Sequence, residues 1–411
     1  MSRAYVHIGL PKTGTSYLQQ TLWTSKDALA ADGVIVPGER HQVQRQAIWD
    51  LLGRRLRGVG QPEIAGAWPA LVETVQAWAG DTVLLSEEFL VHARRGEVRK
   101  IVEALGPAEI HVVVTVRDLG RAIGSMWQQE VAKQLTLPWP EYVAAVRDPS
   151  AGKPMAGVAF WLRYDLEKIL ATWETAVPRE RIHVLTVPPA GGPVTVLLER
   201  FAQATGIDHD SLTPADGPVN QAVGVTGTEV LLRLNHDLAT LDERQYLHVM
   251  RVLRTGLSQA PGVKQPSLPS SEREWAARKA AEVIEFLDSG GYDVVGDLTD
   301  LLPPPSESAA DDGQRVADRQ LADAALVALA HLCKHHAHYW SRTRKLAVTG
   351  DIDARTRLAS ARRAFSYRIR AAGLRAADRH ELLARAAALY FRRISSRSRV
   401  TSATSDSLNV D

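Results

Sequence analysis

Cysteine is nearly absent from this sequence. Its 411 residues contain a single cysteine, Cys333, which excludes an internal disulfide framework and a cysteine-rich zinc site. No apolar run reaches the length of about 18 residues that a transmembrane helix needs, so we expect none. The first residues lack the apolar segment and the small-residue cleavage site of a secretory signal. We therefore expect a cytoplasmic protein.

A net excess of either charge is also lacking. The chain has 49 Lys and Arg against 47 Asp and Glu, a formal net charge of +2. The two signs are nevertheless segregated. Residues 334–411 contain 17 Lys and Arg and 6 Asp and Glu, a balance of +11, which leaves −9 for residues 1–333. The near-neutral total therefore does not exclude an anionic partner for the basic end of the chain.

Short β-branched runs predict buried strands at residues 4–10, 82–86, 109–117 and 182–187. Segments of helical periodicity separate these runs. Continuous apolar strands that alternate with helices are typical of a parallel sheet with helices on both faces. We therefore predict an α/β fold with a parallel β-sheet flanked by helices.

The domain organisation follows from composition. Residues 1–302 are predicted to form the catalytic domain, and the Pro/Ser/Asp-rich segment 303–313 a linker. Residues 314–400 are expected to be a basic helical appendage, and residues 401–411 a disordered tail. Within the first domain, the stretch between expected helices at 227–241 and 271–289 is basic and loop-like.

The first chemical signal lies where the first predicted strand ends. The sequence there is His-Ile-Gly-Leu-Pro-Lys-Thr-Gly-Thr-Ser, and a helix is expected to follow. Backbone N–H groups at such a helix start bind anions, and a lysine adds a positive charge. This pattern predicts a phosphate-binding loop made of Lys12, Thr13, Gly14, Thr15 and Ser16, the alternative being a tight turn without a ligand.

The loop differs from a Walker A motif. Gly9 and Gly14 have the Walker spacing, but Thr15 stands where the Walker lysine would be, and Lys12 precedes Gly14 by two residues. This displacement argues against an ordinary ATPase or GTPase. A P-loop kinase that uses ATP and Mg²⁺ stays open as an alternative.

With its shifted lysine, the loop resembles the 5′-phosphosulfate-binding loop of sulfotransferases. A second site supports the resemblance: Arg117 ends a predicted strand and Ser125 follows eight residues later. In that family, an arginine and a serine at this spacing bind the 3′-phosphate of the donor. The resemblance covers residues 4 to about 302. Within the family, the sequence is most similar in pattern to the bacterial members and the glycan sulfotransferases.

The resemblance implies a P-loop-like α/β fold and a donor, 3′-phosphoadenosine 5′-phosphosulfate, that is used without a metal ion. It implies that Lys12 stabilises the leaving 5′-phosphate and that a carboxylate after the second strand acts as base. Glu87 matches the base position best and Glu88 is next, solvated helix-start carboxylates being the alternative. The acceptor would be a hydroxyl or amine on a carbohydrate, a glycolipid or a small metabolite.

Three further residues are candidates for substrate binding. His7 adjoins the loop, with a buried core role as the alternative. His41 lies in an expected loop that could close over the acceptor. Trp127 comes just after Ser125, the serine expected to bind the 3′-phosphate. It could contact the acceptor or the adenine, with core packing as the alternative.

The C-terminal part carries two more patterns. Histidines recur at His331, His335 and His338, but a single helix without a partner carboxylate indicates a solvated face, so no metal site is predicted. The basic stretch 355–399 could contact an anionic membrane, an acidic partner or the protein's own acidic domain. No nucleic-acid motif is present. A non-catalytic nucleotide-binding protein that acts through this stretch is a third hypothesis, and the oligomeric state stays open.

Overall fold

The protein was analysed as a computed structural model, which describes residues 2–53, 64–150, 154–193, 195–215, 223–260, 264–303 and 316–347. The chain divides into two compact units, residues 1–333 and residues 334–411. Apart from Pro303, the predicted linker 303–313 lies outside the described residues. So do the basic stretch 355–399 and the tail 401–411.

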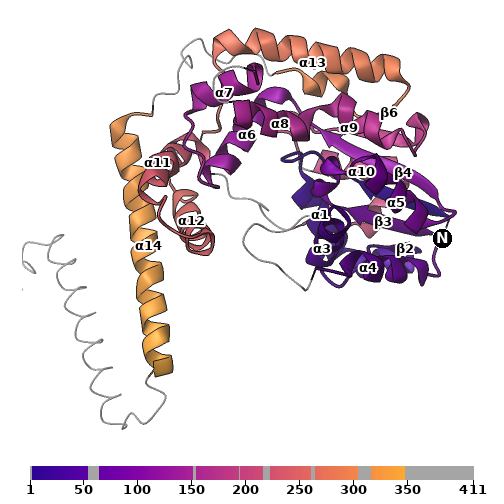
Figure 1. The fold of residues 1–411 in the computed structure, drawn as a ribbon, viewed down its shortest axis with the longest axis horizontal. Helices are drawn as coiled ribbons and strands as arrows, with labels where there is room; N and C mark the ends of the chain where they lie inside the picture. Colours follow the sequence, from indigo (N-terminus) through magenta and orange to yellow (C-terminus); the bar gives the residue numbers. More distant parts are fainter. Residues whose placement is uncertain are drawn as a thin grey trace, which may run out of the picture. The chain divides into compact units, whose positions relative to one another are not determined.

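A six-stranded sheet forms the centre of the first unit (Figure 1). Every strand pair is parallel, and the order is β2-β3-β1-β4-β5-β6. The strands are β1 (Arg3–His7), β2 (Val34–Ile35), β3 (Thr82–Ser86), β4 (Glu109–Val116), β5 (Ile182–Thr186) and β6 (Asp293–Val295). The four predicted strands and the parallel α/β class are confirmed, whereas the short edge strands β2 and β6 were not predicted.

Two apolar layers cover the sheet, because successive side chains of each strand point to opposite faces. One layer contains residues of α3 (His41–Leu51), α4 (Ala67–Gln76), α5 (Arg95–Leu105), α6 (Leu119–Val131), α9 (Leu166–Trp173) and α13 (Ser270–Gly290). The other layer contains α1 (Thr15–Thr24), α2 (Lys26–Ala31) and α10 (Thr195–Thr205). Both faces of the sheet are therefore sealed from water, and its strand ends are left for a site.

The remaining elements extend this framework. They are the helices α7 (Trp139–Arg147), α8 (Pro154–Tyr164), α11 (Gly224–Asp237), α12 (Glu243–Leu257) and α14 (Asp318–Ala347), and the 3₁₀ turns η1 (Glu88–His92), η2 (Arg179–Arg181), η3 (His209–Ser211) and η4 (Leu298–Leu301). The first turns of α14 bury Leu321, Ala324 and Ala328 in the same core layer as α13.

Helix α12 corrects the expectation of a loop-like stretch. Asp242 and Gln245 form a capping box at its start, which satisfies backbone N–H groups that a helix start leaves free. Its apolar face buries Tyr246, Met250 and Leu257. The many arginines of this segment hide an amphipathic helix.

Strand order determines where a site can form. The strand β1 lies between β3 and β4. The chain therefore adds β2 and β3 on one side of β1, and later β4, β5 and β6 on the other side. At such a switch point the connections diverge and leave a crevice at the carboxyl ends of the strands. The segments after β3, β1 and β4 therefore meet at one edge of the sheet, and these are the segments that carry the predicted site residues.

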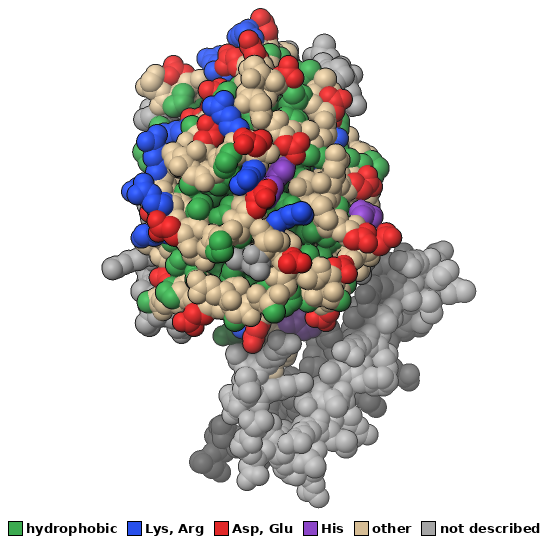
Figure 2. Space-filling view, turned by 90° about the vertical axis from the view of Figure 1, so that its right-hand side faces the viewer, with side chains coloured by type: hydrophobic (Ala, Val, Ile, Leu, Met, Phe, Trp, Pro, Cys, Tyr) green, Lys and Arg blue, Asp and Glu red, His purple; other side chains and the backbone are tan. Residues whose placement is uncertain are grey.

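The surface gives less information. Figure 2 shows basic and acidic side chains interspersed over the face that it draws, without a large patch of either sign. Among the helices of the described ranges, none combines the length and the apolar character that a membrane crossing requires.

Candidate functional site

The loop between β1 and α1 has an unusual backbone. Lys12 has a φ of 68°, in the left-handed region that a side chain rarely adopts, and Gly14 follows with a φ of 89°. The conformation at Lys12 costs about 1–2 kcal/mol relative to an ordinary one. The surrounding contacts must supply that energy.

Two side chains from distant elements hold the loop by its carbonyl groups. Arg117, at the end of β4, donates from Nη1 to the carbonyl oxygen of Lys12 at 2.7 Å. Tyr164, at the end of α8, donates its hydroxyl to the carbonyl oxygen of Pro11. A positively charged donor makes the first of these bonds stronger than a neutral one. The peptide groups before and after the left-handed Lys12 are thus both held by hydrogen bonds.

The hydroxyl of Thr13 fixes the inner side of the loop. It lies 2.5 Å from the carbonyl oxygen of Leu10 and 2.6 Å from the hydroxyl of Thr115 on β4. Both threonines are fully buried. Thr13 is therefore engaged in holding the loop to the sheet.

Close packing explains Gly9. A Cβ atom at this position would overlap with Oγ1 of Thr15, and it would lie 2.6 Å from Oγ1 of Thr115 and 2.8 Å from Nε2 of His7. Real Cβ atoms essentially never come so close to other atoms. The chain must pass this point without a side chain.

The start of α1 is open to an anion. No side chain caps it, and its first turn contains no acidic residue. The first N–H groups of a helix lack partners within the helix and carry partial positive charge. Ser16 is exposed in this turn, and Ser125 is half-buried on α6. The second cation, Arg117, has a buried Nε atom without a hydrogen-bond partner in the described part of the chain.

Positive charge converges on Lys12. Burial and the nearby charge of Arg254 lower the pKa of the Lys12 amine. Arg117 and Lys133 act in the same direction, and Glu88 opposes them. Like charges held together in this way favour a polyanionic ligand that would relieve their repulsion. The sequence analysis did not identify Lys133 or Arg254, which belong to surface segments without a motif.

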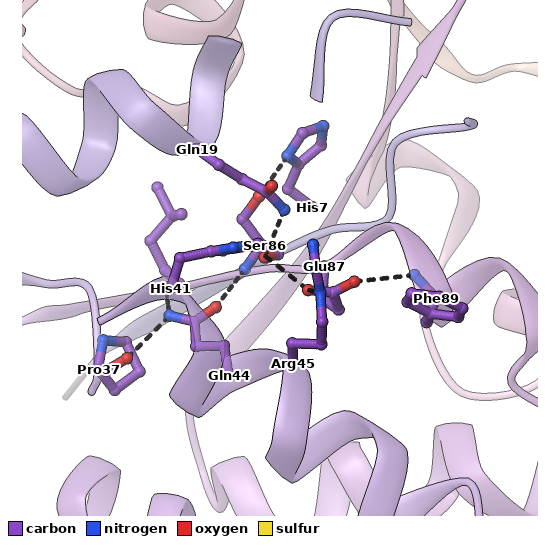
Figure 3. A network of polar contacts seen from close by, with 10 residues as sticks. His7, Gln19, Pro37, His41, Gln44, Arg45, Ser86, Glu87 and Phe89 are labelled. Carbon is purple, nitrogen blue, oxygen red and sulfur yellow. Dashed lines mark hydrogen bonds and ion pairs between the residues drawn. The ribbon is translucent and has the colours of Figure 1, made fainter. Parts of the chain in front are cut away.

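Glu87, directly after β3, is fully buried and ion-paired (Figure 3). Its Oε2 atom lies 3.4 Å from Nε of Arg45 and 3.4 Å from Nε2 of His41, both on α3. Its Oε1 atom accepts a long hydrogen bond of 3.5 Å from the backbone N–H of Phe89. These contacts engage both oxygens of the carboxylate that the sequence analysis preferred as the base.

The end of β3 is anchored through Ser86. The side chain of Gln19 donates to its carbonyl oxygen at 2.9 Å, and the side chain of Gln44 accepts its N–H at 2.8 Å. The Ser86 hydroxyl lies 2.8 Å from Nδ1 of His7 (Figure 3). Helices α1 and α3 thereby fix the strand end that carries the two acidic residues. Neither glutamine was identified from the sequence.

Glu88 differs from its neighbour. It is only partly buried. Burial and the adjacent charge of Glu87 raise the pKa of its carboxyl group, whereas Arg45 and Lys12 lower it. A carboxyl group with a raised pKa close to a cationic loop has the properties of a general base.

The three candidate substrate residues lie in different surroundings. His7 is fully buried with its ring edge-on to Phe201. His41 is not in a loop as expected but begins α3, where its ring packs edge-on against Trp23. Trp127 is 1% exposed, and its indole N–H donates to the carbonyl oxygen of Leu137. Its contacts fit the core-packing alternative.

In the ranges that the structure describes, no cluster of three or more His, Cys, Asp or Glu residues is arranged to hold a metal ion.

Comparisons with known proteins do not assign this chain to a family. No protein-family model matches the sequence, and no curated protein does. Among solved structures, a sulfotransferase from Alicyclobacillus acidocaldarius is similar at a TM-score of 0.34 and 15% sequence identity. The match covers 60% of this chain and 96% of that one.

Replacement of Gly9 tests the packing of the loop. Gly9→Ala should lower the free energy of unfolding by about 1–3 kcal/mol, the usual effect of an overpacked core. Urea unfolding followed by circular dichroism measures it. The control is Gly96→Ala on α5, where nothing lies within 4 Å of the added carbon. Equal stability of the two variants would contradict the packing argument.

His7 provides a test through pH. Burial lowers its pKa from 6.5 to about 3. Below pH 6.5 the unfolded chain therefore binds a proton that the folded chain excludes. Protonation of His7 alone should lower the free energy of unfolding by about 1.4 kcal/mol for each unit that the pH falls between 6.5 and 3.

The measurement is urea unfolding at several pH values between 7 and 4. His7→Gln should remove most of this slope, and His7→Asn should do the same if the first variant fails to fold. The exposed His236→Gln is the matched control and should keep the wild-type slope. An unchanged slope in the His7 variants would refute the assignment.

Proposed function

We propose that this protein is a sulfotransferase that moves a sulfuryl group from 3′-phosphoadenosine 5′-phosphosulfate to an acceptor hydroxyl or amine. The observation that carries the proposal is the direct bond between the two cationic elements. Arg117 at the end of β4 donates to the carbonyl oxygen of Lys12 in the loop after β1. The loop lysine and the strand-end arginine are thus held next to each other and would offer two anion-binding positions, as a donor with separate 5′ and 3′ phosphates requires.

The residues divide between the two phosphates. The 5′-phosphosulfate would bind at the first turn of α1, where N–H groups and the Lys12 amine offer hydrogen bonds and charge. The 3′-phosphate would bind Arg117, which has an unpartnered buried Nε, and the hydroxyl of Ser125. The residues present fit this donor.

Glu88 serves best as the base. It would take the proton of the acceptor hydroxyl as the acceptor oxygen bonds to sulfur. The bond between sulfur and the 5′-phosphate oxygen then breaks, and the 3′,5′-bisphosphate leaves with its negative charge facing Lys12. Glu87, held by Arg45 and His41, positions the strand end. The acceptor class we propose is a carbohydrate, a glycolipid or a small metabolite.

Calorimetry tests donor binding. Wild-type protein should bind 3′-phosphoadenosine 5′-phosphate, and Lys12→Ala and Arg117→Ala should each weaken that binding by about 10- to 100-fold, since each removes a charged hydrogen bond. Lys100→Ala, an exposed residue on α5, is the control and should bind as the wild type does. Binding of ATP that requires Mg²⁺, with no binding of the bisphosphate, would overturn the proposal in favour of a kinase.

The base is tested by transfer from a donor with labelled sulfur to a panel of sugars, glycolipids and small alcohols. Glu88→Gln should retain bisphosphate affinity but lose transfer by about 10²- to 10⁴-fold, the usual contribution of a general base. Glu87→Gln should first lower the free energy of unfolding, because it disrupts a buried ion pair. Full transfer activity in Glu88→Gln together with a stable, inactive Glu87→Gln would reverse the two roles.

A further inference from the structure

Two histidines meet at the edge of the sheet opposite to the candidate site. His111 on β4 and His183 on β5 both lie near the amino ends of their strands. Their side chains are largely buried, with 13% and 10% of their surface exposed. Nδ1 of His111 is 2.8 Å from Nε2 of His183, a hydrogen-bond distance between two ring nitrogens. The pair is separate from the residues proposed to bind the donor, which lie at the carboxyl ends of the strands.

A carboxylate faces the outer nitrogen of each ring. Oε1 of Glu109 is 3.1 Å from Nε2 of His111, and Oδ2 of Asp293 is 2.5 Å from Nδ1 of His183. The four side chains form one row of contacts across β4, β5 and β6. Asp293 is also the direct neighbour of His183 in the strand register. The row therefore attaches β6, an edge strand of only three residues, to the sheet.

The number of protons on the two rings follows from these contacts. An ionised carboxylate only accepts hydrogen bonds, so Nε2 of His111 and Nδ1 of His183 must each carry a proton. The contact between the rings needs a third proton, because two bare nitrogens at 2.8 Å would direct their lone pairs at each other. Three protons on two imidazole rings make one positive charge. Two neutral histidines carry only two protons and cannot satisfy all three contacts.

A second positive charge on the pair is opposed by its surroundings. Burial lowers the pKa of His111, and the charges of His183 and Arg181 act in the same direction, whereas Glu109 opposes them. Nε of Arg181 lies 3.4 Å from Oε1 of Glu109, so this carboxylate is shared between the two cations. The ring of Tyr5 on β1 stacks on His111 at a centroid distance of 4.9 Å, and burial raises the pKa of its hydroxyl, which keeps it uncharged. The surroundings therefore suit a single positive charge.

We propose that His111 and His183 share one proton, and that this singly charged pair holds the edge strand β6 to the sheet in a pH-dependent way. While the proton is present, Asp293 faces a positive charge and every contact in the row is satisfied. When a rise in pH transfers the proton to water, the two rings repel each other and Asp293 loses its cationic partner. The strand is then held by its backbone pairing with β5 and by Asp300 on the next turn, which lies 2.7 Å from Arg200. Alkaline pH thus loosens β6 and leaves the rest of the sheet in place.

Nitrogen-15 NMR of histidine-labelled protein tests the proton count, because bare and protonated ring nitrogens differ in chemical shift. At pH 8 an ordinary histidine carries one proton on its two nitrogens. The exposed His236 should show this state, whereas His111 and His183 together should carry three protons. Loss of signals in His111→Gln and in His183→Gln assigns the resonances. Two neutral rings at pH 8 would overturn the proposal.

Asp293→Asn tests the charge through stability. An asparagine amide can donate to Nδ1 of His183, so the pair can satisfy its contacts with two protons and no charge. Above about pH 6.5 the wild-type folded chain holds one proton more than the unfolded chain, so its equilibrium constant for unfolding should rise about tenfold per pH unit until the pair releases that proton. Urea unfolding between pH 6.5 and 9 measures this rise. Asp293→Asn should remove most of it, and Asp288→Asn, an exposed residue on α13, is the matched control and should keep it.

Hydrogen exchange shows whether the effect is local. After correction for the intrinsic pH dependence of exchange, protection of a peptide that contains β6 should fall by about threefold or more from pH 6.5 to 9 in the wild type and stay constant in Asp293→Asn. A peptide that contains β1, inside the sheet, should keep its protection in both proteins. Equal unfolding slopes in Asp293→Asn and the wild type, or β6 protection that does not change with pH, would refute the role of the pair. These measurements use the protein without a nucleotide, so their outcome does not depend on the sulfotransferase proposal.

Discussion

The hydrogen bond from Arg117 to the carbonyl oxygen of Lys12 is the contact on which the site depends. It joins the end of β4 to the loop after β1, and with the Tyr164 hydroxyl it holds Lys12 at a φ of 68°. Without these anchors the loop would relax toward an ordinary conformation, because the left-handed one is costly for lysine. The same guanidinium is a ligand candidate for phosphate, so one side chain shapes the loop and binds beside it.

This arrangement concentrates like charge at a price in stability. Lys12, Arg117, Lys133 and Arg254 are close enough for the last three to lower the pKa of the first. Glu88 is the carboxylate that opposes this repulsion, while the neighbouring Glu87 is neutralised by Arg45. The acidic excess of residues 1–333 is thus not reflected at the crevice, where a polyanion would meet positive charge. A site that is destabilised without its ligand is prepared to bind one.

The sequence was informative where local patterns are strong. Continuous apolar runs predicted the central strands, and the chemistry at their ends predicted that Lys12, Arg117 and one of the adjacent acids Glu87 and Glu88 meet at one edge, with Glu87 as the preferred base. The strands β2 and β6 were missed because two or three residues leave no periodic signal. Helix α12 was missed because the basic composition of its segment was taken to indicate a loop, although the sequence contains the capping box that begins the helix. Tyr164 could not be found, since an aromatic residue in a helix predicts core packing, and its bond to Pro11 spans 153 positions.

Phosphorus NMR of bound 3′-phosphoadenosine 5′-phosphate tests the central claim most directly, because the two phosphates give separate signals. At saturation, both signals should shift in the wild-type protein. Ser125→Ala should reduce the shift of the 3′-phosphate alone, and Lys12→Ala chiefly that of the 5′-phosphate. Arg117→Ala should disturb both, since Arg117 binds one phosphate and holds the loop for the other. A 5′ signal in Arg117→Ala identical to that of the wild type, or two signals that never shift, would contradict this account.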